Sequence, residues 1–331
     1  MNKQIPDLMG SNPFLLNSSE FKLGQKLGKG GFGEVYKADY RHTQVAIKQI
    51  LLIEEELSEE SLDEFQSECK VMARLRYPHI VDFYGYFLEP KPTIVMQFMP
   101  KGSLRSVLKG KTELPWPLRI KIATDIAKGL AFLHNEKILH LDLKSLNVLL
   151  DDNFNGKICD FGLATLKQET RSNQRSKSSM PGASSHMAAG GTLPWMAPEL
   201  FGKKPKSTFK TDIYSLGMTL WELYSRTTPF AQVKNDSLII SMVKDGERED
   251  FDVEGEDCPE DFKEIIQDCW KADPTKRPDA DEIVKRLNKI SYGDVANINI
   301  KKLEKKPLEE EVKKEDQGKY NEEAQRIYLF L

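Results

Sequence analysis

The sequence of 331 residues lacks several features that define whole classes of protein. No apolar run approaches the roughly 20 residues of a membrane-spanning helix, so we expect no membrane span. Only four cysteines are present, and the gaps between them match neither a zinc site nor a dense disulfide framework. Free thiols in a reducing compartment are the simplest interpretation, which favours a cytoplasmic location.

Charge of one sign is also lacking, because 48 basic side chains face 51 acidic ones and the net charge is -3. Such a balance gives no global field, so we expect no nucleic-acid partner and no attraction to an anionic membrane. Apolar residues make up 39% of the chain and charged residues 30%. We therefore expect a polar tail or long loops beside a globular core.

The first hundred residues alternate between apolar and polar positions and predict a small, mostly antiparallel sheet. Strands are expected at 21–27, 35–40, 44–50, 81–87 and 93–99. Between the third and the fourth, apolar residues recur three or four positions apart, which predicts an amphipathic helix over 59–76. The sheet would therefore carry one helix.

Beyond Pro100-Lys101-Gly102 the pattern becomes helical. Helices are expected at 117–135, 211–226, 261–271 and 279–290. Residues 167–191 are rich in serine, glycine and basic side chains and predict a loop. Residues 301–331 carry as many basic as acidic side chains, which is typical of a solvated helix or a disordered tail.

A glycine-rich motif, Gly28-Lys-Gly30-Gly-Phe-Gly33, follows the first expected strand. It fits a dinucleotide-binding turn only if a helix follows directly, with an acid such as Glu54 about 20 residues on. The residues after Gly33 instead predict a strand. This favours a glycine-rich hairpin laid over phosphates, where backbone amides approach the oxygens closely. A merely flexible hairpin is the third interpretation.

The segment Val45-Ala46-Ile47-Lys48 places a lysine on an apolar strand. Such a lysine can bind nucleotide phosphates if a carboxylate fixes it. Glu68, next to the apolar stripe of the expected helix, is the candidate partner, and Glu64, one turn earlier, is the competitor. A lone lysine on a strand is more often a solvated charge, so this pair matters only together with other motifs.

The segment His140-Leu-Asp142-Leu-Lys144-Ser-Leu-Asn147 supplies those motifs. Asp142 is placed to orient a substrate hydroxyl and accept its proton, and Lys144 to stabilise a transferring phosphate. Asn147 would hold a metal ion. Asp160-Phe161-Gly162 follows, and its aspartate would bind the principal Mg²⁺. An isolated Asp-Phe-Gly is more often a turn, but this order and spacing indicate phosphoryl transfer.

Together with Ala197-Pro198-Glu199, the Asp212–Gly217 segment and Arg277-Pro278, these motifs make residues 21–290 resemble a eukaryotic-type protein kinase. The resemblance implies an α+β bilobal fold, with a small β-rich N-lobe with one helix and a larger, mostly helical C-lobe. The implied segments are an N-terminal extension at 1–20, the N-lobe at 21–99, the C-lobe at 100–290 with its activation segment at 160–199, and a charged tail at 291–331.

The same resemblance implies that the chain uses ATP with Mg²⁺ or Mn²⁺ and phosphorylates a protein substrate. Catalysis would rest on Asp142, Lys144, Lys48 and Glu68, and metal binding on Asn147 and Asp160. The implied ATP-binding residues are Gly28, Gly30, Gly33, Val35, Ala46, Lys48, Met96, Gln97, Met99 and Leu149. Within the large lobe, Glu199 should pair with Arg277, and Asp212 should hold the backbone of the catalytic loop.

Substrate type and subgroup follow from finer details of the resemblance. Lys144 and Thr192 resemble the corresponding positions of Ser/Thr kinases. Gly102-Ser103-Leu104 and Trp116–Arg119 are most similar to the tyrosine-kinase-like group, and within it to the receptor-interacting-protein (RIP) kinases. We therefore expect a signalling enzyme of Ser/Thr specificity.

One position departs from the kinase pattern. Leu141 replaces an arginine that normally pairs with a phosphate on the activation loop. We therefore expect control by a kinase dimer or an activating partner, or else constitutive activity. Four serines lie among basic residues and are candidate phosphorylation sites, with autophosphorylation as one route; a passive serine-rich loop is the alternative. They are Ser172, Ser176, Ser178 and Ser179.

Two other functions fit parts of the sequence. The first is a pseudokinase or scaffold that binds nucleotide without catalysis, although the lysine and metal positions are intact. The second is a small-molecule phosphotransferase, although the Ala-Pro-Glu segment resembles a platform for protein substrates. A bacterial effector delivered into a host would carry the same motifs and would act in the host cytosol.

Overall fold

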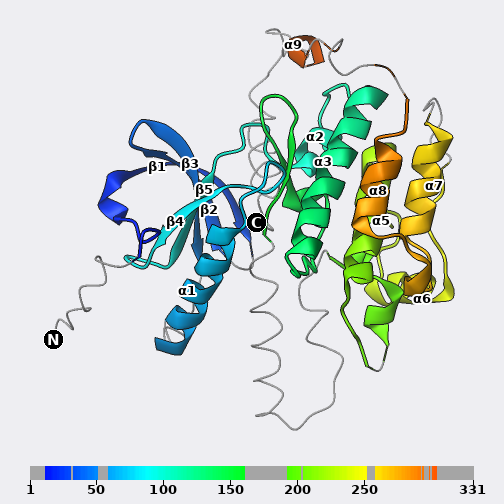
Figure 1. Cartoon of the computed structure of the whole chain (residues 1–331), viewed down its shortest axis with the longest axis horizontal. Coiled ribbons are helices and arrows are strands. Elements are labelled where there is room, and N and C mark those ends of the chain that lie inside the picture. The colour runs from blue at the N-terminus through cyan, green and yellow to red at the C-terminus, as the bar shows by residue number, and fades with distance from the viewer. Residues whose placement is uncertain are drawn as a thin grey trace. The chain divides into compact units, whose positions relative to one another are not determined.

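The structure is a computed structural model, and it describes residues 12–30, 33–50, 59–160, 192–202, 204–251, 258–291, 293, 298 and 300–303. These residues fall into two compact units (Figure 1). Those of the first unit lie within Met1–Tyr77 and Val81–Met99, and those of the second within Pro78–Ile80 and Pro100–Asp316. Within the described ranges, every helix is too short or too polar to cross a lipid bilayer.

The first unit is a five-stranded antiparallel sheet packed against one helix, α1 (Glu59–Arg74). The strands lie in the order β1-β2-β3-β5-β4. Their bounds are Phe21–Gly30 for β1, Gly33–Tyr40 for β2, Thr43–Ile50 for β3, Phe83–Phe87 for β4 and Thr93–Gln97 for β5. The expected strands and helix are therefore all present, with ends that differ by a few residues.

The apolar core of the first unit is divided between the two faces of the sheet, because successive residues of a strand point to opposite faces. One face carries Ala38, Val45, Ile47, Phe87 and Val95. The other face carries Phe83, Tyr86 and Ile94, which pack with Phe65 and Cys69 of α1. The apolar stripe of α1 thus covers this second face.

The glycine-rich motif joins β1 to β2, and Gly30 is paired with Gly33. A β-carbon on Gly33 would collide with the carbonyl oxygen of Gln49 on the adjacent β3, so the close pairing of β2 and β3 requires glycine here. Because a strand and not a helix follows Gly33, the dinucleotide-binding turn considered from the sequence is excluded.

Residues 12–20, expected as an extension, belong to the first unit. Leu15 forms a parallel β-bridge with Tyr86 of β4, and a short turn, η1 (Ser18–Glu20), leads into β1. This segment therefore pairs with the edge strand β4 and extends the sheet beyond it.

The second unit is mostly helical and is built around α5 (Phe209–Ser225), in which every residue from Thr211 to Ser225 is buried. Helices α3 (Trp116–Asn135) and α7 (Glu260–Cys269) pack against α5, and α8 (Ala280–Leu287) packs against α3. These four helices were expected. The polar residues of α5 from Thr211 onward are buried as well, and Asp212, Ser215, Thr219 and Glu222 all take part in hydrogen bonds.

Other elements of the second unit were not expected; most of them are too short for a periodic pattern, but α6 is as long as α7. They are α2 (Leu104–Lys109), α6 (Asp236–Asp245), the hairpin of β6 (Val148–Leu150) and β7 (Gly156–Ile158), and the turns η3 (Ser145–Asn147), η5 (Leu193–Trp195), η6 (Pro198–Phe201) and η7 (Pro274–Lys276). The expected tail also contains structure: α9 (Ile300–Leu303) buries Leu303, whose carbonyl oxygen accepts a hydrogen bond from Glu113. The β-rich first unit and the helical second unit confirm the α+β class.

Candidate active site

Lys48 and Glu68 are both buried in the first unit, with 1% and 6% of their surface exposed. Lys48 pairs directly with Val35 of β2 and with Ile94 of β5. Paired residues point to the same face, so Lys48 lies on the face that α1 covers. Glu68 stands on α1 next to Cys69, which packs on that face. The side chain of the competing Glu64 lies outside the described residues.

The other predicted ATP-binding residues of the first unit lie on neighbouring strands. Val35, Ala46, Lys48 and Met96 share one face of the sheet, since Val35 pairs with Lys48 and Ala46 pairs with Met96. The remaining ones are Gly28 and Gly30 in β1, Gly33 in β2, Gln97 at the end of β5, and Met99 just beyond it. Leu149 lies in β6 of the second unit.

Asp142, Lys144 and Asn147 meet in the second unit. Lys144 Nζ donates to Asp142 Oδ1 and to Thr192 Oγ1, at 3.1 Å each. Asn147 Nδ2 donates to Asp142 Oδ2 at 3.1 Å and to the Asp142 carbonyl oxygen at 2.7 Å. Both carboxylate oxygens of Asp142 thus accept a hydrogen bond, which fixes their orientation. Because 18% of the Asp142 side chain is exposed, a substrate hydroxyl can reach it.

The amide oxygen of Asn147 fits a metal ion. Asn147 Oδ1 is buried without a hydrogen-bond partner, whereas Nδ2 of the same amide is bonded to Asp142. Amide and carboxylate oxygens are the protein ligands that Mg²⁺ takes. Asp160, the other predicted ligand, follows Cys159, whose N–H donates to the Asn147 carbonyl oxygen at 3.0 Å. The backbone therefore ties the two candidate ligand segments together.

Additional ligands would have to come from outside the side-chain cluster. Across the described part of the chain, no group of three or more His, Cys, Asp or Glu residues gathers into a metal site. Mg²⁺ in phosphoryl-transfer sites commonly completes its octahedral shell with nucleotide phosphates and water. The pair Asn147 and Asp160 is compatible with such a shared shell.

Asp212 of α5 holds the backbone of the catalytic loop, as expected. Its carboxylate accepts hydrogen bonds from the N–H groups of His140 and Leu141, at 2.8 Å each. Leu141 has a φ of 62°, in the left-handed region that a leucine rarely adopts. Charge-assisted hydrogen bonds to a buried carboxylate offset this strain. The loop supplies only backbone N–H groups to this anchoring, so the anchoring does not need the arginine that Leu141 replaces.

His140 joins the catalytic loop to the segment before Asp160. Its ring is fully buried, and Nδ1 accepts a hydrogen bond from the Asp142 N–H at 3.2 Å. Nε2 therefore carries the proton and donates to the Cys159 carbonyl oxygen at 3.0 Å. Burial lowers the pKa of His140, which favours this neutral form.

Glu222 of α5 connects three segments around the catalytic loop and was not singled out from the sequence. Its carboxylate accepts from Ser145 Oγ at 2.6 Å, from Trp195 Nε1 at 2.7 Å and from the Ser145 N–H at 3.2 Å. Arg105 of α2 donates at 3.3 Å. Burial raises the pKa of Glu222 to about 7, although each of these donors lowers it.

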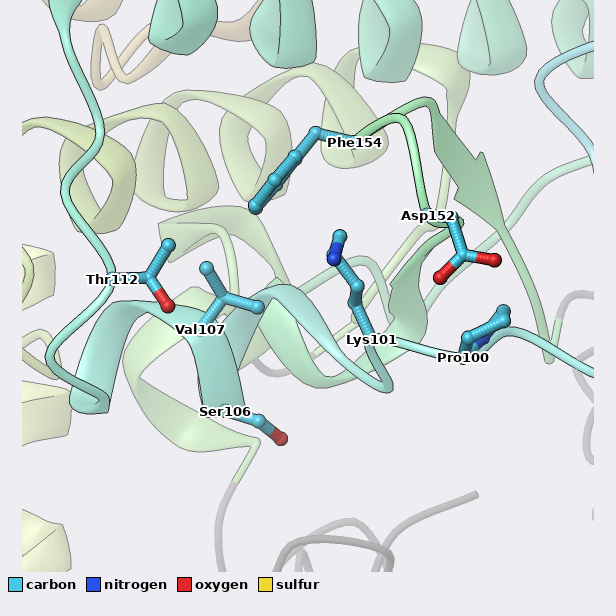
Figure 2. Close-up of a pocket in the computed structure, with 7 residues that line it drawn as sticks. All are labelled: Pro100, Lys101, Ser106, Val107, Thr112, Asp152 and Phe154. Atoms are coloured by element: carbon cyan, nitrogen blue, oxygen red, sulfur yellow. The ribbon is translucent and has the colours of Figure 1, made fainter. Parts of the chain in front are cut away.

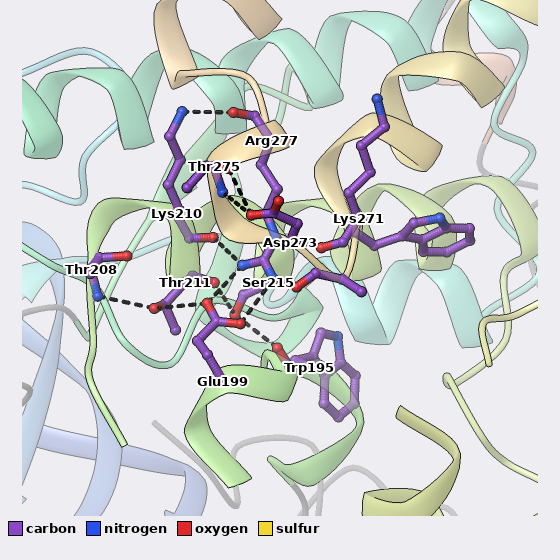
Figure 3. A network of polar contacts seen from close by, with 12 residues as sticks. Trp195, Glu199, Thr208, Lys210, Thr211, Ser215, Lys271, Asp273, Thr275 and Arg277 are labelled. Atoms are coloured by element: carbon purple, nitrogen blue, oxygen red, sulfur yellow. Dashed lines mark hydrogen bonds and ion pairs between the residues drawn. The ribbon is translucent and has the colours of Figure 1, made fainter. Parts of the chain in front are cut away.

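Glu199 and Arg277 form the ion pair that the sequence predicted (Figure 3). Arg277 donates to both carboxylate oxygens of Glu199, at 2.8 and 2.9 Å. Its other N–H groups donate to backbone carbonyls of Lys210, Lys271 and Ala272. A buried guanidinium with its donors satisfied fixes the Ala-Pro-Glu segment against α5 and the turn η7.

A pocket of about 380 Å³ also occurs in the second unit, away from these groups (Figure 2). It lies beside α2 and the loop between β6 and β7, and none of the predicted site residues lines it. Lys101 projects into it and places Nζ 4.7 Å from the ring centroid of Phe154. The lining residues are Pro100, Lys101, Ser106, Val107, Thr112, Asp152 and Phe154.

Several predictions fall on residues outside the described ranges. These are the candidate phosphorylation sites Ser172, Ser176, Ser178 and Ser179, and most of the activation segment 160–199. For that segment, the structure describes Asp160 and the residues from Thr192 onward.

Comparison with protein families identifies the class of this chain. The model of the protein tyrosine and serine/threonine kinase family matches residues 21–287. The chain therefore belongs to this family, and its fold is the bilobal protein kinase fold.

Several relatives of the chain carry the names of serine/threonine-protein kinases. A putative serine/threonine-protein kinase/receptor, R831, of Acanthamoeba polyphaga mimivirus is 35% identical over 87% of this chain and 17% of its own length. The probable serine/threonine-protein kinase drkA of Dictyostelium discoideum is 36% identical over 84% of this chain and 41% of its own. The probable serine/threonine-protein kinase SIS8 of Arabidopsis thaliana is 36% identical over 82% of this chain and 25% of its own length. The chain thus spans less than half the length of these relatives.

Proposed function

We propose that the chain is a protein kinase that transfers the γ-phosphate of ATP to serine or threonine of protein substrates. The observation that carries the proposal is the cluster of Asp142, Lys144, Asn147 and Thr192. It joins a carboxylate that is 18% exposed, a buried lysine and an amide oxygen without a hydrogen-bond partner. Family membership and the names of the relatives support the same activity.

In this proposal each of the clustered side chains has one role. Asp142 orients the attacking hydroxyl and accepts its proton. Lys144, held by Asp142 and Thr192, stabilises negative charge on the transferring phosphate. Asn147 and Asp160 would hold the divalent ion, Mg²⁺ or Mn²⁺, which neutralises phosphate charge when bound. Lys48, oriented by Glu68, would bind nucleotide phosphates from the first unit.

The subgroup and the regulation are also proposed. The Gly102-Ser103-Leu104 and Trp116–Arg119 segments support membership of the tyrosine-kinase-like group, close to the RIP kinases. Leu141 is incompatible with pairing to a loop phosphate, which supports control by a dimer or an activating partner. Autophosphorylation of the loop serines, a signalling role and a cytoplasmic location remain part of this proposal.

The test is transfer from γ-labelled ATP with Mg²⁺ or Mn²⁺ to the chain itself and to generic protein substrates. Wild type is compared with Asp142→Asn and with Asp160→Ala, and the labelled amino acids are then identified. Label on serine or threonine that disappears in both variants is expected. A thermal shift with Mg²⁺ and ATP but no transfer, alone or with added lysate, would instead favour a nucleotide-binding scaffold.

A further inference from the structure

An N-terminal strap, residues 12–16, lies outside the part of the chain that the family model matches and yet pairs with the sheet. The N–H of Leu16 donates to the carbonyl oxygen of Tyr86, and the N–H of Tyr86 donates to that of Phe14, at 2.8 Å each. Since β4 is the last strand of the sheet, the strap satisfies backbone groups at an edge.

Strand β4 is shaped to receive the strap. A β-carbon on Gly85 would lie 2.5 Å from the carbonyl oxygen of Phe14 and 2.7 Å from Leu16 Cδ1. No side chain fits into this space, and Gly85 also has a φ of 156°. The glycine therefore permits a backbone contact that any other residue would block.

The strap reaches α1 through Tyr86. Asn12 Nδ2 donates to the Tyr86 hydroxyl at 2.8 Å, and this hydroxyl donates to Gln66 Oε1 of α1 at 3.3 Å. Burial raises the pKa of Tyr86, so the hydroxyl stays protonated and able to donate. Phe65 of α1 packs edge-on against the Tyr86 ring, with centroids 5.7 Å apart.

The same packing reaches Glu68. Phe14 and Leu15 pack on the cluster that contains Phe65 and Cys69, and the Phe14 and Phe83 rings lie 5.9 Å apart. Phe65 and Cys69 precede and follow Glu68 on α1, so a shift of this cluster would move the carboxylate. The strap thus supports the helix that carries the proposed partner of Lys48.

We propose that the N-terminal strap is a positioning element for α1: Asn12 and Phe14 hold Tyr86, and Tyr86 holds the helix with Glu68 in place. This inference rests on the role proposed above for Glu68. The strap residues contact β4 and the cluster on α1, so their effect on phosphate transfer would be indirect. Loss of the strap would let α1 move while the rest of the sheet stays folded.

The experiment uses Asn12→Ala and Phe14→Ala with two matched controls in the full chain. Asn17→Ala removes an asparagine whose side chain caps only the local turn η1. Phe21→Ala removes a ring that packs on Tyr40 and Phe87 at the opposite face of the sheet. Hydrogen exchange of the α1 amides, residues 59–74, is measured together with phosphate transfer.

Faster exchange in α1 is expected for both strap variants, about fivefold for Asn12→Ala, which corresponds to the loss of one hydrogen bond. The controls should leave α1 exchange unchanged. Unchanged α1 exchange in the strap variants, or an equal increase in the controls, would overturn the inference. Hydrogen exchange needs no catalysis. An inactive wild-type chain would therefore refute the proposed function, while the exchange data would still test the role of the strap.

A second arm separates positioning from general loss of stability. Phe14→Ala should lower the rate of phosphate transfer in the wild-type background but add little in a Glu68→Gln background, because both changes act on the same carboxylate. Multiplicative losses in the double variant would show that the strap acts by another route and would contradict the proposal.

Discussion

In the first unit, α1 is joined to the sheet by an apolar cluster of Phe65, Cys69, Phe83, Tyr86 and Ile94. In the second unit, the catalytic loop is held by two buried carboxylates, Asp212 and Glu222. The difference follows from local structure. An amphipathic helix on a sheet presents side chains to pack, whereas an irregular loop presents unpaired backbone N–H groups that need acceptors.

This comparison teaches which substitutions each unit tolerates. Packing depends on volume. The stability of the first unit should therefore fall more when a ring is lost than when a charge changes and the shape is kept. A hydrogen-bonded carboxylate depends on its charge and acceptor geometry, so the second unit should be sensitive even to isosteric changes. The predictions below test this contrast.

Phe65→Ala should have the largest effect on stability. The ring is 5% exposed and fills the space between α1 and β4, so its loss should lower the free energy of unfolding by about 4 kcal/mol. Phe65→Leu, which keeps most of the volume, should cost about 1 kcal/mol. Urea unfolding of both variants measures this difference, and equal costs would show that volume does not control the first unit.

Asp212→Asn should lower the free energy of unfolding by about 3 kcal/mol although it preserves shape, because an amide replaces a charged acceptor of two backbone N–H groups. The matched control is Asp279→Asn, whose carboxylate pairs with Lys210 but is 80% exposed. That change should stay within about 0.5 kcal/mol. Similar losses of unfolding free energy at the two positions would show that buried and exposed acids do not differ in this respect.

Glu222 predicts a pH dependence of stability that Glu34 of the first unit does not share. Burial raises its pKa from 4.5 to about 7, so the folded state binds a proton more tightly than the unfolded state. The stabilising contribution is present below about pH 4.5 and is lost as the pH rises through about 7. Between pH 5 and 7 the loss should amount to about 2 kcal/mol.

The measurement compares wild type with Glu222→Gln, because the raised pKa of Glu249 and the lowered pKa values of His79 and His140 also contribute between pH 5 and 7. The difference in the free energy of unfolding between the two proteins should change with pH by this amount. Glu34→Gln serves as the contrast in the first unit. Lys26 and Tyr36 lower the pKa of Glu34 to about 2, so its contribution is constant above pH 5.

The sequence predicted features whose causes are local. Alternation and helical spacing identified the strands and α1, and Asp142, Lys144 and Asn147 lie within six positions of one another. The contacts of Asp212 and of Glu199 with Arg277 were expected only from the resemblance to kinases, because their partners lie about seventy or more residues away. Long-range pairs of this kind leave no periodic signal.

The roles of Glu222 and of the N-terminal strap were not predicted from the sequence, again because their partners are distant along the chain. The partners of Glu222 lie 27, 77 and 117 residues away, and Asn12 meets Tyr86 across 74 residues. One signal was available for Glu222, since an acid in a buried helix must find hydrogen-bond donors. For the strap, Gly85 inside an expected strand was a sign of close backbone approach.

Thr192→Val should give the smallest effect, and it tests whether polar contacts also set activity in the second unit. The change removes the hydroxyl that accepts a hydrogen bond from Lys144 but keeps the shape of the side chain. Phosphate transfer should fall about fivefold, the equivalent of one hydrogen bond. Thr192→Ser keeps the hydroxyl and should retain most of the activity. If valine and serine behave alike, Lys144 is held by Asp142 alone, and the contact with Thr192 does not contribute to catalysis.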